Sequence, residues 1–280
     1  MHSHPPTSLP PACRPPIRWA GGKQRLLAAI REHLPEAKRL IEPFMGAGSV
    51  FFGTDYPEAI LGDANYDLIA LWTAIRERPS EFIARASTFY VEENRSDEAY
   101  RRIRSEYNNA ADSFERAVRF MYLNRFGFNG IYRVNRKGEL NVPYGKPKVL
   151  AMFPYDRVAA ASEKLQTAAL LAGGYVGTMA LARTGDVVYC DPPYSDLVDA
   201  RSFTSYTTAG FAAADHRRLV DEALAARERG ATVVISNHDT AETRALYCKF
   251  DLVTLSTSRT VAASAGSRRD VREILAVARP

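Results

Sequence analysis

VVYCDPPY, residues 187–194, indicates the fold class of this chain. The first four residues form an apolar run, which is typical of a strand buried on both faces of a parallel sheet. The two prolines end that strand, because proline has no amide proton for a sheet hydrogen bond. Ligands of open α/β sheets bind beyond the carboxyl ends of the strands, so we expect residues 191–194 to face a bound molecule.

The tetrapeptide at residues 191–194 has the groups needed to hold a planar base that carries an amino group. Asp191 and the carbonyl of Pro192 can accept the two amino hydrogens while Tyr194 stacks on the ring. The prolines fix the backbone, so both acceptors are in place before the base arrives. The alternative is a strand followed by a Pro-Pro turn in which the aspartate has no special role.

Composition predicts a globular protein of one large or two small domains. The 280 residues are 46% hydrophobic and 25% charged, values typical of a soluble chain. Its three cysteines are far apart and no secretory signal begins the chain, so we expect a cytoplasmic, nucleoid-associated protein without disulfides. The uncharged residues 165–182 include three glycines, which favours a helix end plus a strand over a membrane span.

The net charge of +5 is concentrated in one segment. Residues 116–148 contain eight basic residues against Glu139 alone, which gives this segment +7 and leaves −2 for the rest of the chain. Aromatic and asparagine side chains are interleaved with the basic ones. This mixture is typical of a surface that reads bases, although a charge run is also commonly a solvated face.

Two glycine turns precede this segment. Gly21-Gly22-Lys23 stands before a helical pattern, where it suits a bound anion or a plain capping turn. A strand over residues 40–44 leads into a turn whose glycines, Gly46 and Gly48, permit close backbone approach. The third glycine of a dinucleotide fingerprint is missing, so this turn is weak evidence for a nicotinamide oxidoreductase.

Asp63 follows the next predicted strand, residues 59–61. A carboxylate at that position can take both hydroxyls of a ribose, as in other βαβ nucleoside sites. The alternative is an N-cap for a helix over residues 64–75, a role for which aspartate is equally suited.

The rest of the chain divides into two patterns. Residues 67–122 have helical periodicity, and residues 133–142 resemble a hairpin turned at Arg136-Lys137-Gly138. From Phe153 onward strand and helix patterns alternate again, including a helix ended by Gly230 and strands at 232–235, 252–255 and 273–277. We therefore predict a disordered Pro-rich tail (1–16), a catalytic domain (17–66 and 150–280) and an inserted recognition domain (67–149).

Six motifs, in this order, resemble the Dam-type DNA adenine methyltransferases, the D12 class with α motif order, which modify the N6 amino group of adenine. They are RWAGGK (18–23), EPFMGAG (42–48), DAN (63–65), LNRFGFNGIYRVNRKGELNVPYG (123–145), DPPY (191–194) and SNHDT (236–240). The resemblance implies an α/β fold: a Rossmann-like, S-adenosylmethionine-dependent methyltransferase sheet with a mostly helical DNA-recognition insert that carries a basic β-hairpin. It also implies S-adenosylmethionine as methyl donor, no metal and duplex DNA as partner, and we expect a monomer without membrane contact.

The resemblance also assigns site residues. Catalysis is expected of Asp191, Pro192 and Tyr194. Cofactor binding is expected of Trp19, Lys23, Phe44, Gly46, Gly48, Asp63 and Asp191. DNA binding is expected of Arg18, Asn124, Arg125, Phe128, Asn129, Arg133, Asn135 and Lys146.

Two of these positions depart from the family pattern, which commonly has lysine at position 18 and tyrosine at position 128. Arg18 keeps the donors that can read a guanine, and Phe128 keeps the aromatic wedge but loses a hydroxyl contact. A GATC site is the expected target, with Arg133 bidentate to a guanine edge.

Other functions remain alternatives. Relatives with similar tetrapeptides methylate cytosine, RNA or glutamine, and a DNA-binding protein without activity could keep the recognition domain. Cys190 is expected to pack in the core and not to act as a thiolate. Ser236, His238 and Asp239 are too close in sequence to form a hydrolase triad, and no His/Cys cluster has metal-ligand spacing.

Overall fold

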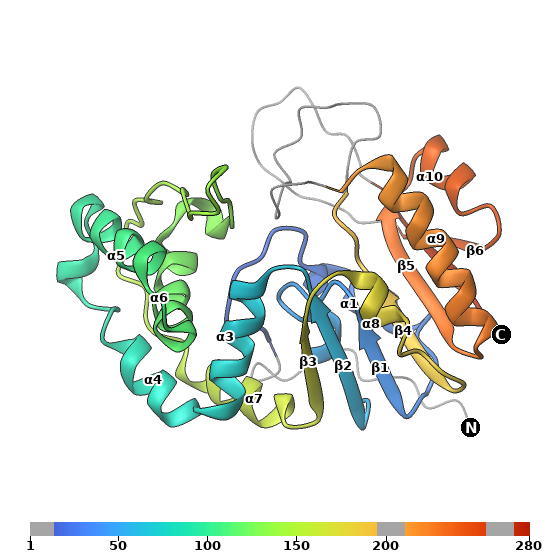
Figure 1. Cartoon of the computed structure of the whole chain (residues 1–280), viewed down its shortest axis with the longest axis horizontal. Helices are drawn as coiled ribbons and strands as arrows, with labels where there is room; N and C mark the ends of the chain where they lie inside the picture. Colours follow the sequence, from blue (N-terminus) through green and yellow to red (C-terminus); the bar gives the residue numbers. More distant parts are fainter. Residues whose placement is uncertain (1–13, 195–210, 256–271) are drawn as a thin grey trace.

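The computed structural model describes residues 14–194, 211–255 and 272–280. Within these residues the centre of the molecule is a seven-stranded sheet with the order β3-β2-β1-β4-β5-β7-β6 (Figure 1). The strands are β1 (Arg39–Glu42), β2 (Glu58–Asp63), β3 (Ala168–Ala172), β4 (Asp186–Cys190), β5 (Thr232–His238), β6 (Asp251–Leu255) and β7 (Glu273–Ala278). Neighbours among β1 to β5 pair in parallel, and β7 lies antiparallel to both β5 and β6. The predicted Rossmann-like α/β sheet is confirmed.

The order of the sheet reverses between β1 and β4. From β1 the chain continues to β2 and β3 on one side, whereas β4 is followed by β5 on the other. Such a switch point leaves room beyond the carboxyl ends of the two central strands, where open α/β sheets bind ligands. Residues that follow Glu42 and Cys190 therefore come out side by side at this edge.

The two faces of the sheet belong to two separate apolar clusters, because successive strand residues point in opposite directions. In β4, Val187 and Tyr189 pack into one cluster, while Val188 and Cys190 pack into the other. Cys190 is fully buried, as the sequence predicted. Helices cover both faces, which explains why the strands are almost continuously apolar.

The helices next to the sheet are mostly short. They are α1 (Leu27–Arg31), α2 (Ser49–Phe52), α3 (Tyr66–Glu77), α7 (Tyr155–Leu165), α8 (Tyr175–Met179), α9 (Ala213–Glu228) and α10 (Ala241–Leu246). Residues of α1, α2, α3 and α7 join the cluster of Val187, and those of α8 and α9 join the cluster of Val188. The uncharged residues 165–182 form the end of α7, strand β3 and helix α8, so the expected helix end and strand are confirmed.

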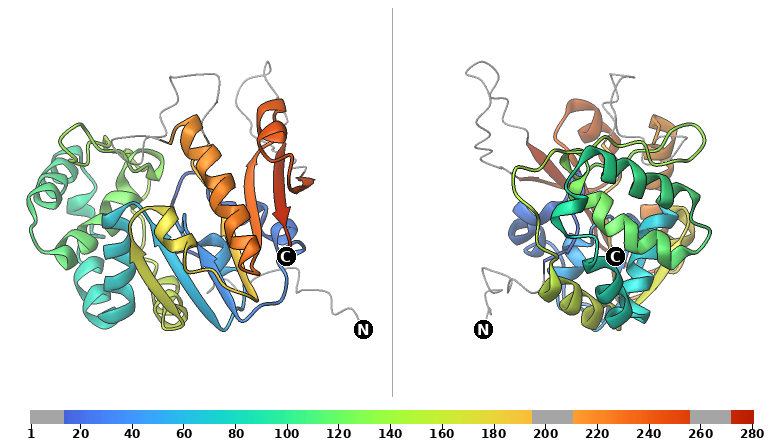
Figure 2. Two further views of the ribbon diagram at one scale, coloured as in Figure 1. Left: turned by 45° about the vertical axis from the view of Figure 1, so that its right-hand side comes forward. Right: turned by 90° about the vertical axis from the view of Figure 1, so that its left-hand side faces the viewer.

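A bundle of three helices lies to one side of the sheet (Figure 2, green segment). It consists of α4 (Pro79–Ser87), α5 (Asp97–Asn109) and α6 (Ser113–Phe126). The side chains of Ser96 and Asp112 cap α5 and α6 by accepting backbone N–H groups. Helix α3 contacts α6 as well as β2 and β3, so it joins the bundle to the sheet.

The segment after α6 forms the predicted hairpin. A 3₁₀ turn at Phe128–Gly130 leads into an antiparallel bridge between Val134 and Leu140. Asn135 N donates to Glu139 O at 2.9 Å, which closes the turn. The limits of the catalytic and recognition domains stay a prediction.

Residues 1–13 of the predicted tail lie outside the described residues, whereas Pro15 is buried. In the described part of the chain, no helix is both long enough and apolar enough to cross a membrane.

Candidate active site

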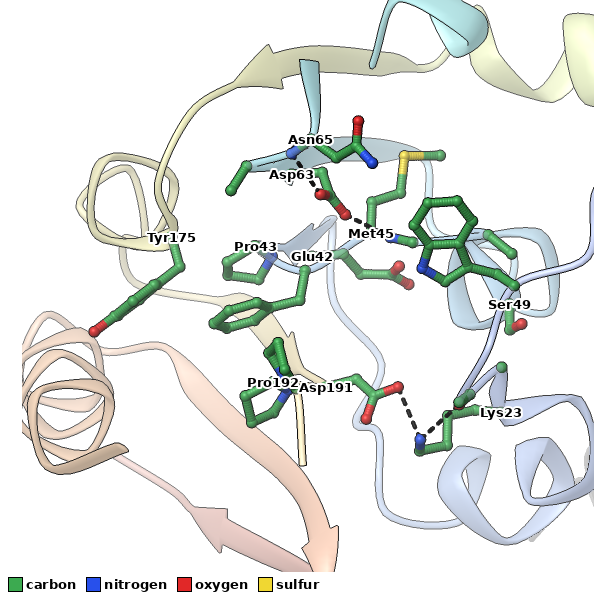
Figure 3. Close-up of a pocket in the computed structure, with 18 of the residues that line it drawn as sticks. Lys23, Glu42, Pro43, Met45, Ser49, Asp63, Asn65, Tyr175, Asp191 and Pro192 are labelled. Carbon is green, nitrogen blue, oxygen red and sulfur yellow. Dashed lines mark hydrogen bonds and ion pairs between the residues drawn. The ribbon is translucent and has the colours of Figure 1, made fainter. Parts of the chain in front are cut away.

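A pocket of about 410 Å³ opens at the switch point, beyond the carboxyl ends of β1, β2 and β4 (Figure 3). All but one of the residues predicted to bind cofactor or to act in catalysis line this pocket. Its lining includes Trp19, Lys23, Phe44, Gly46, Asp63, Asp191, Pro192 and Tyr194. Residues as far apart in the sequence as Trp19 and Tyr194 thus share one cavity of the size usual for a small-molecule ligand.

Gly48 is the exception, because it is absent from the pocket lining. It has φ +69 at the start of α2, and a Cβ there would lie 3.0 Å from Phe52 Cε2. Gly46 has φ +50, and its Cβ would lie 3.0 Å from Trp19 Cδ1. Both glycines therefore permit a left-handed turn under close packing, and only Gly46 also lines the cavity.

Asp63 holds the turn and faces the pocket. Its Oδ2 accepts from Gly46 N and its Oδ1 from Asn65 N, each at 2.9 Å. Burial raises the pKa of Asp63, and the two backbone bonds oppose that rise. The N-cap of α3 is Asn65, which accepts from Leu68 N, so the alternative role of Asp63 as that cap is excluded. A carboxylate has about four acceptor positions, so two remain for a ligand.

Asp191 is held through both of its carboxylate oxygens. Lys23 Nζ lies 2.9 Å from Oδ2, and Ser236 Oγ donates to Oδ1 at 2.9 Å (Figure 3 shows the first contact). Lys23 also donates to Gly21 O at 2.8 Å, and its Nζ lies 4.6 Å from the centre of the Tyr194 ring. The lysine therefore stands against both the acceptor and the aromatic face of the tetrapeptide.

Tyr194 is fixed by a strand from the far end of the chain. Its hydroxyl donates to Glu273 Oε2 at 3.3 Å, and its ring centre lies 4.4 Å from that of His238. Burial, together with the nearby carboxylate charge of Asp191, raises the pKa of Tyr194 well above its ordinary value. The phenol therefore stays protonated and acts as a donor.

Glu42 is a pocket residue that the sequence reasoning missed. It ends β1, lines the pocket and is only 2% exposed, and its Oε1 has no hydrogen-bond partner among the described residues. Burial, assisted by the charge of Asp191, raises its pKa to about 8. One signal was available: Glu42-Pro43-Phe44 repeats the acid–proline–aromatic pattern of Asp191 to Tyr194.

Two groups of aromatic rings contribute to the pocket. The Trp19 ring lies 5.9 Å from that of Tyr132, and Phe44 stacks on Tyr175 at 5.2 Å. Tyr132 belongs to the segment between α6 and the hairpin, so one group is supported by the predicted recognition domain. Flat apolar walls with a few polar groups between them suit a nucleoside.

Four of the residues predicted to bind DNA are grouped near the end of α6: Arg18, Arg125, Phe128 and Asn129. Arg18 and Phe128 are exposed, Phe128 by 49%, and Asn129 adopts a left-handed φ of 54°. A Cβ on Gly130 would lie 2.6 Å from Arg18 Cβ, so the two segments are packed tightly together. Burial and the charge of Arg18 lower the pKa of Arg125, which shows that two cationic side chains lie close to each other.

Asn124 is buried, although the sequence reasoning placed it among the DNA-binding residues. Its Oδ1 accepts from Arg18 N at 2.9 Å, and its Nδ2 donates to Arg18 O at 2.7 Å. It also donates to Gly130 O at 3.4 Å. Asn124 thus fixes the backbone of Arg18, and a direct contact with DNA stays a prediction.

The hairpin holds its polar side chains by local bonds. Arg133 donates from Nε to Asn141 Oδ1 at 2.8 Å and from Nη2 to Asn141 O at 3.1 Å. Asn135 Nδ2 donates to Glu139 Oε2 at 2.7 Å. Lys146 is exposed and has a left-handed φ of 49°. These contacts hold the hairpin in shape, whereas its role in reading DNA stays a prediction.

Two further constellations do not form active sites. Burial raises the pKa of the Cys190 thiol far above its ordinary value, so this group is not a thiolate nucleophile. Ser236 donates to Asp191, and Asp239 is paired with Arg244 at 2.5 and 2.9 Å, so the hydroxyl and the carboxylate that a triad would need are both bonded to other residues. In the described ranges, no three His, Cys, Asp or Glu side chains are grouped in a way that could hold a metal ion.

Comparison with known proteins gives a consistent result. Residues 19–261 match the family model described as D12 class N6 adenine-specific DNA methyltransferase. The chain is 43% identical over 265 residues to a DNA adenine methylase of Vibrio cholerae serotype O1. The aligned region covers 94% of this chain and 95% of that protein. DNA adenine methylases of Escherichia coli K12 and Serratia marcescens are each 42% identical over 94% of this chain, and over 95% and 97% of their own lengths.

Proposed function

The chain belongs to the D12 class N6 adenine-specific DNA methyltransferases, and from that premise we propose that it methylates a flipped-out adenine within GATC, with S-adenosylmethionine as donor. The family acts on the adenine amino group in DNA, which separates this chain from the cytosine, RNA, glutamine and non-enzymatic alternatives. The donor, the base flip and the sequence GATC are the parts that we propose.

One observation carries the proposal: the acid that follows β2 and the tetrapeptide that follows β4 line the same pocket. Asp63 keeps acceptor positions for the two hydroxyls of a ribose, and Trp19 and Phe44 offer flat faces to a nucleoside. Asp191, the Pro192 carbonyl and Tyr194 are assigned to the adenine. A methyl donor and its acceptor can therefore meet in one cavity.

Lys23 is assigned to the carboxylate of the methionine moiety. In the structure it contacts Asp191 and lies over the Tyr194 ring, which are the two groups that adenine needs. A second carboxylate gives the ammonium an alternative partner, so the lysine can leave Asp191 when the cofactor binds. Cofactor binding thereby opens the adenine site.

Glu42 is assigned to the cationic end of the cofactor. Its pKa of about 8 means that it is mostly protonated at neutral pH. S-adenosylmethionine carries an ammonium and a sulfonium, and a nearby positive charge favours the ionised form of a carboxyl. We expect cofactor binding to release part of a proton between pH 7 and 8.

The chemistry needs no covalent intermediate on the protein. When bound, S-adenosylmethionine would supply a methyl group: the adenine nitrogen would form a bond to the methyl carbon, the carbon–sulfur bond would break with its electron pair left on sulfur, and the nitrogen would lose one of its two protons to solvent. The lone pair of that nitrogen is delocalised into the ring, so it is a weak nucleophile. Hydrogen bonds from the amino group to Asp191 and to the Pro192 carbonyl favour a pyramidal nitrogen whose lone pair is free to attack.

Access to the amino group requires the base to leave the duplex, which costs a few kcal/mol. Phe128 is an exposed aromatic next to the two arginines near the end of α6, and we assign it as the wedge that fills the gap. Stacking on Tyr194 offsets part of the cost. Arg18 and Arg133 are assigned to the guanines of the site.

Methyl transfer from tritiated S-adenosylmethionine to three substrates tests the proposal. The substrates are a GATC duplex, a duplex in which GATC is replaced by GTAC, and an RNA duplex of the same length. We expect label on the first substrate alone. Equal labelling of both DNA duplexes would overturn GATC specificity, and label on RNA alone would overturn the substrate class.

Arg133→Ala tests the assignment to a guanine. Loss of a bidentate contact costs about 1–3 kcal/mol of discrimination at one base pair, so kcat/KM should fall for GATC but hardly for a site altered at that guanine. Arg136→Ala, an exposed arginine in the same turn, is the matched control. An equal loss on all sequences would show that Arg133 contacts only phosphate.

A further inference from the structure

The two oxygens of Asp191 have partners of different kinds. Oδ2 faces Lys23, which lines the pocket at the end of a flexible chain. Oδ1 faces Ser236, which lies on β5, is 1% exposed and does not line the pocket. One oxygen is thus directed to the ligand space and the other to the sheet.

The sheet register places Ser236 beside Asp191. Strands β4 and β5 pair in parallel with Cys190 opposite Ile235, so the next residue of each strand is also a neighbour. The Ser236 hydroxyl lies 2.9 Å from Asp191 Oδ1 and 3.4 Å from Cys190 O. It has one proton, and the shorter contact to a charged acceptor takes it.

Tyr189, which itself lines the pocket, donates to Ser236. The Tyr189 hydroxyl lies 3.1 Å from Ser236 Oγ, and its side chain is 3% exposed. Burial raises the pKa of this phenol well above its ordinary value, and the charge of Asp191 raises it further. The phenol therefore stays a donor, and the direction of the chain from Tyr189 through Ser236 to Asp191 is fixed.

We propose that Ser236, supported by Tyr189, is a positioning residue. Its hydrogen bond to Oδ1 of Asp191 ties that oxygen to β5 and leaves Oδ2 to accept from the amino group of the substrate. A carboxylate can rotate about its Cβ–Cγ bond, and rotation would turn the acceptor away from the nitrogen. The serine bond opposes this rotation while the ligand exchanges with Lys23. Catalytic geometry is sensitive to such displacements.

This role rests on the proposed function, and steady-state kinetics on a GATC duplex test it. Ser236→Ala should lower kcat about 10- to 100-fold, which is the value of a hydrogen bond to a charged group. KM for DNA and the affinity for S-adenosylhomocysteine, measured by calorimetry, should change less than threefold, because the residues that line the pocket are untouched. Tyr189→Phe keeps the serine bond and should lower kcat by a smaller factor.

Two comparisons separate positioning from a purely structural effect. In the Asp191→Asn background, Ser236→Ala should cause less than a threefold further loss, since the group it orients is already changed. Ser162→Ala removes another buried hydroxyl, on α7, and should leave kcat unchanged. Thermal unfolding of each variant shows whether it is folded.

Each outcome decides the question. An active wild type with an unchanged kcat for both Ser236→Ala and Tyr189→Phe would overturn the role of Ser236 and leave the proposed function standing. Parallel losses of melting temperature, cofactor affinity and kcat would also overturn it, in favour of a structural role. A folded wild type that methylates no adenine would overturn the proposed function together with this inference.

Discussion

The ends of β1 and β4 have similar local sequence patterns, but their acids have different partners. Each is an apolar strand followed by an acid, a proline and an aromatic residue, and the two strands are neighbours. Glu42 is buried with one unpartnered oxygen and a pKa of about 8. Asp191 has a lysine on one oxygen and a serine on the other. The partners supplied by distant segments, and not the local pattern, decide how each acid can be used.

The largest expected effect is at Asp191, whose two carboxylate oxygens both have partners. Asp191→Asn keeps the shape of the side chain but removes its charge, so one amino hydrogen loses a charged acceptor. We expect kcat to fall about 10²- to 10³-fold, measured on a GATC duplex, with little change in DNA affinity.

Asp251→Asn is the control for this change, because Asp251 is an exposed carboxylate on β6 of the same sheet. It should have wild-type activity. Near-normal turnover by Asp191→Asn would show that Asp191 is as dispensable as Asp251 and would contradict its role as an acceptor for the amino group.

The next largest expected effect is at Glu42, the acid with one unpartnered oxygen. Glu42 has a pKa of about 8 in the folded protein against an ordinary 4.5, so the folded state binds the proton more tightly than the unfolded chain. Its contribution to stability is fully present below pH 4.5 and is lost as the pH rises to 8. Over pH 5 to 8 this loss is about 3 kcal/mol.

The side chain introduced by Glu42→Gln does not titrate, so this pH-dependent loss of unfolding free energy should be absent from the variant. In urea unfolding at pH 5, 6, 7 and 8, the free energy of unfolding of the variant should rise relative to that of the wild type by about 3 kcal/mol across this range. Glu58→Gln, a half-exposed acid on β2, serves as the control. Parallel curves for Glu42→Gln and the wild type would mean that Glu42 is ionised in the folded protein.

The smallest expected effect is at Lys23, the ion-pair partner of Asp191. Lys23→Met leaves Asp191 without its ammonium but with Ser236, so we expect the free energy of unfolding at pH 7 to fall by about 2 kcal/mol. Asp191 keeps 20% exposure, which limits the cost. In the Asp191→Asn background the same change should cost much less.

Lys38→Met provides a matched lysine, because Lys38 pairs with Glu58 at the surface and is 76% exposed. Its loss should cost less than about 0.5 kcal/mol. Equal effects at the two lysines would show that Asp191 does not depend on Lys23.

Much of the fold could be predicted because its signals are local. Apolar runs marked the central strands, and prolines marked the end of β4, so the position of residues 191–194 at the carboxyl edge followed from the sequence. The hairpin turn at Arg136-Lys137-Gly138 was likewise visible in its residues. Asp63 was placed correctly at the end of β2, although only the structure showed that Asn65 is the helix cap.

Partners and burial could not be predicted in the same way. Asn124 looks like other asparagines of the basic segment, yet the structure buries it against Arg18. Ser236 meets Asp191 from 45 residues away. Nothing near Glu42 in the sequence indicates that its oxygen lacks a partner, because that depends on which segments pack over β1.

The sequence by itself determined the strand–acid–proline pattern, the basic segment and the family resemblance, since these are properties of neighbouring residues. Only in the folded chain is it settled that burial raises the pKa of Glu42, which oxygen of Asp191 faces the pocket and which polar residues are buried. The physical reason is that burial and hydrogen-bond partners set the free energy of a charge, and both are supplied by segments that only the folded chain brings together.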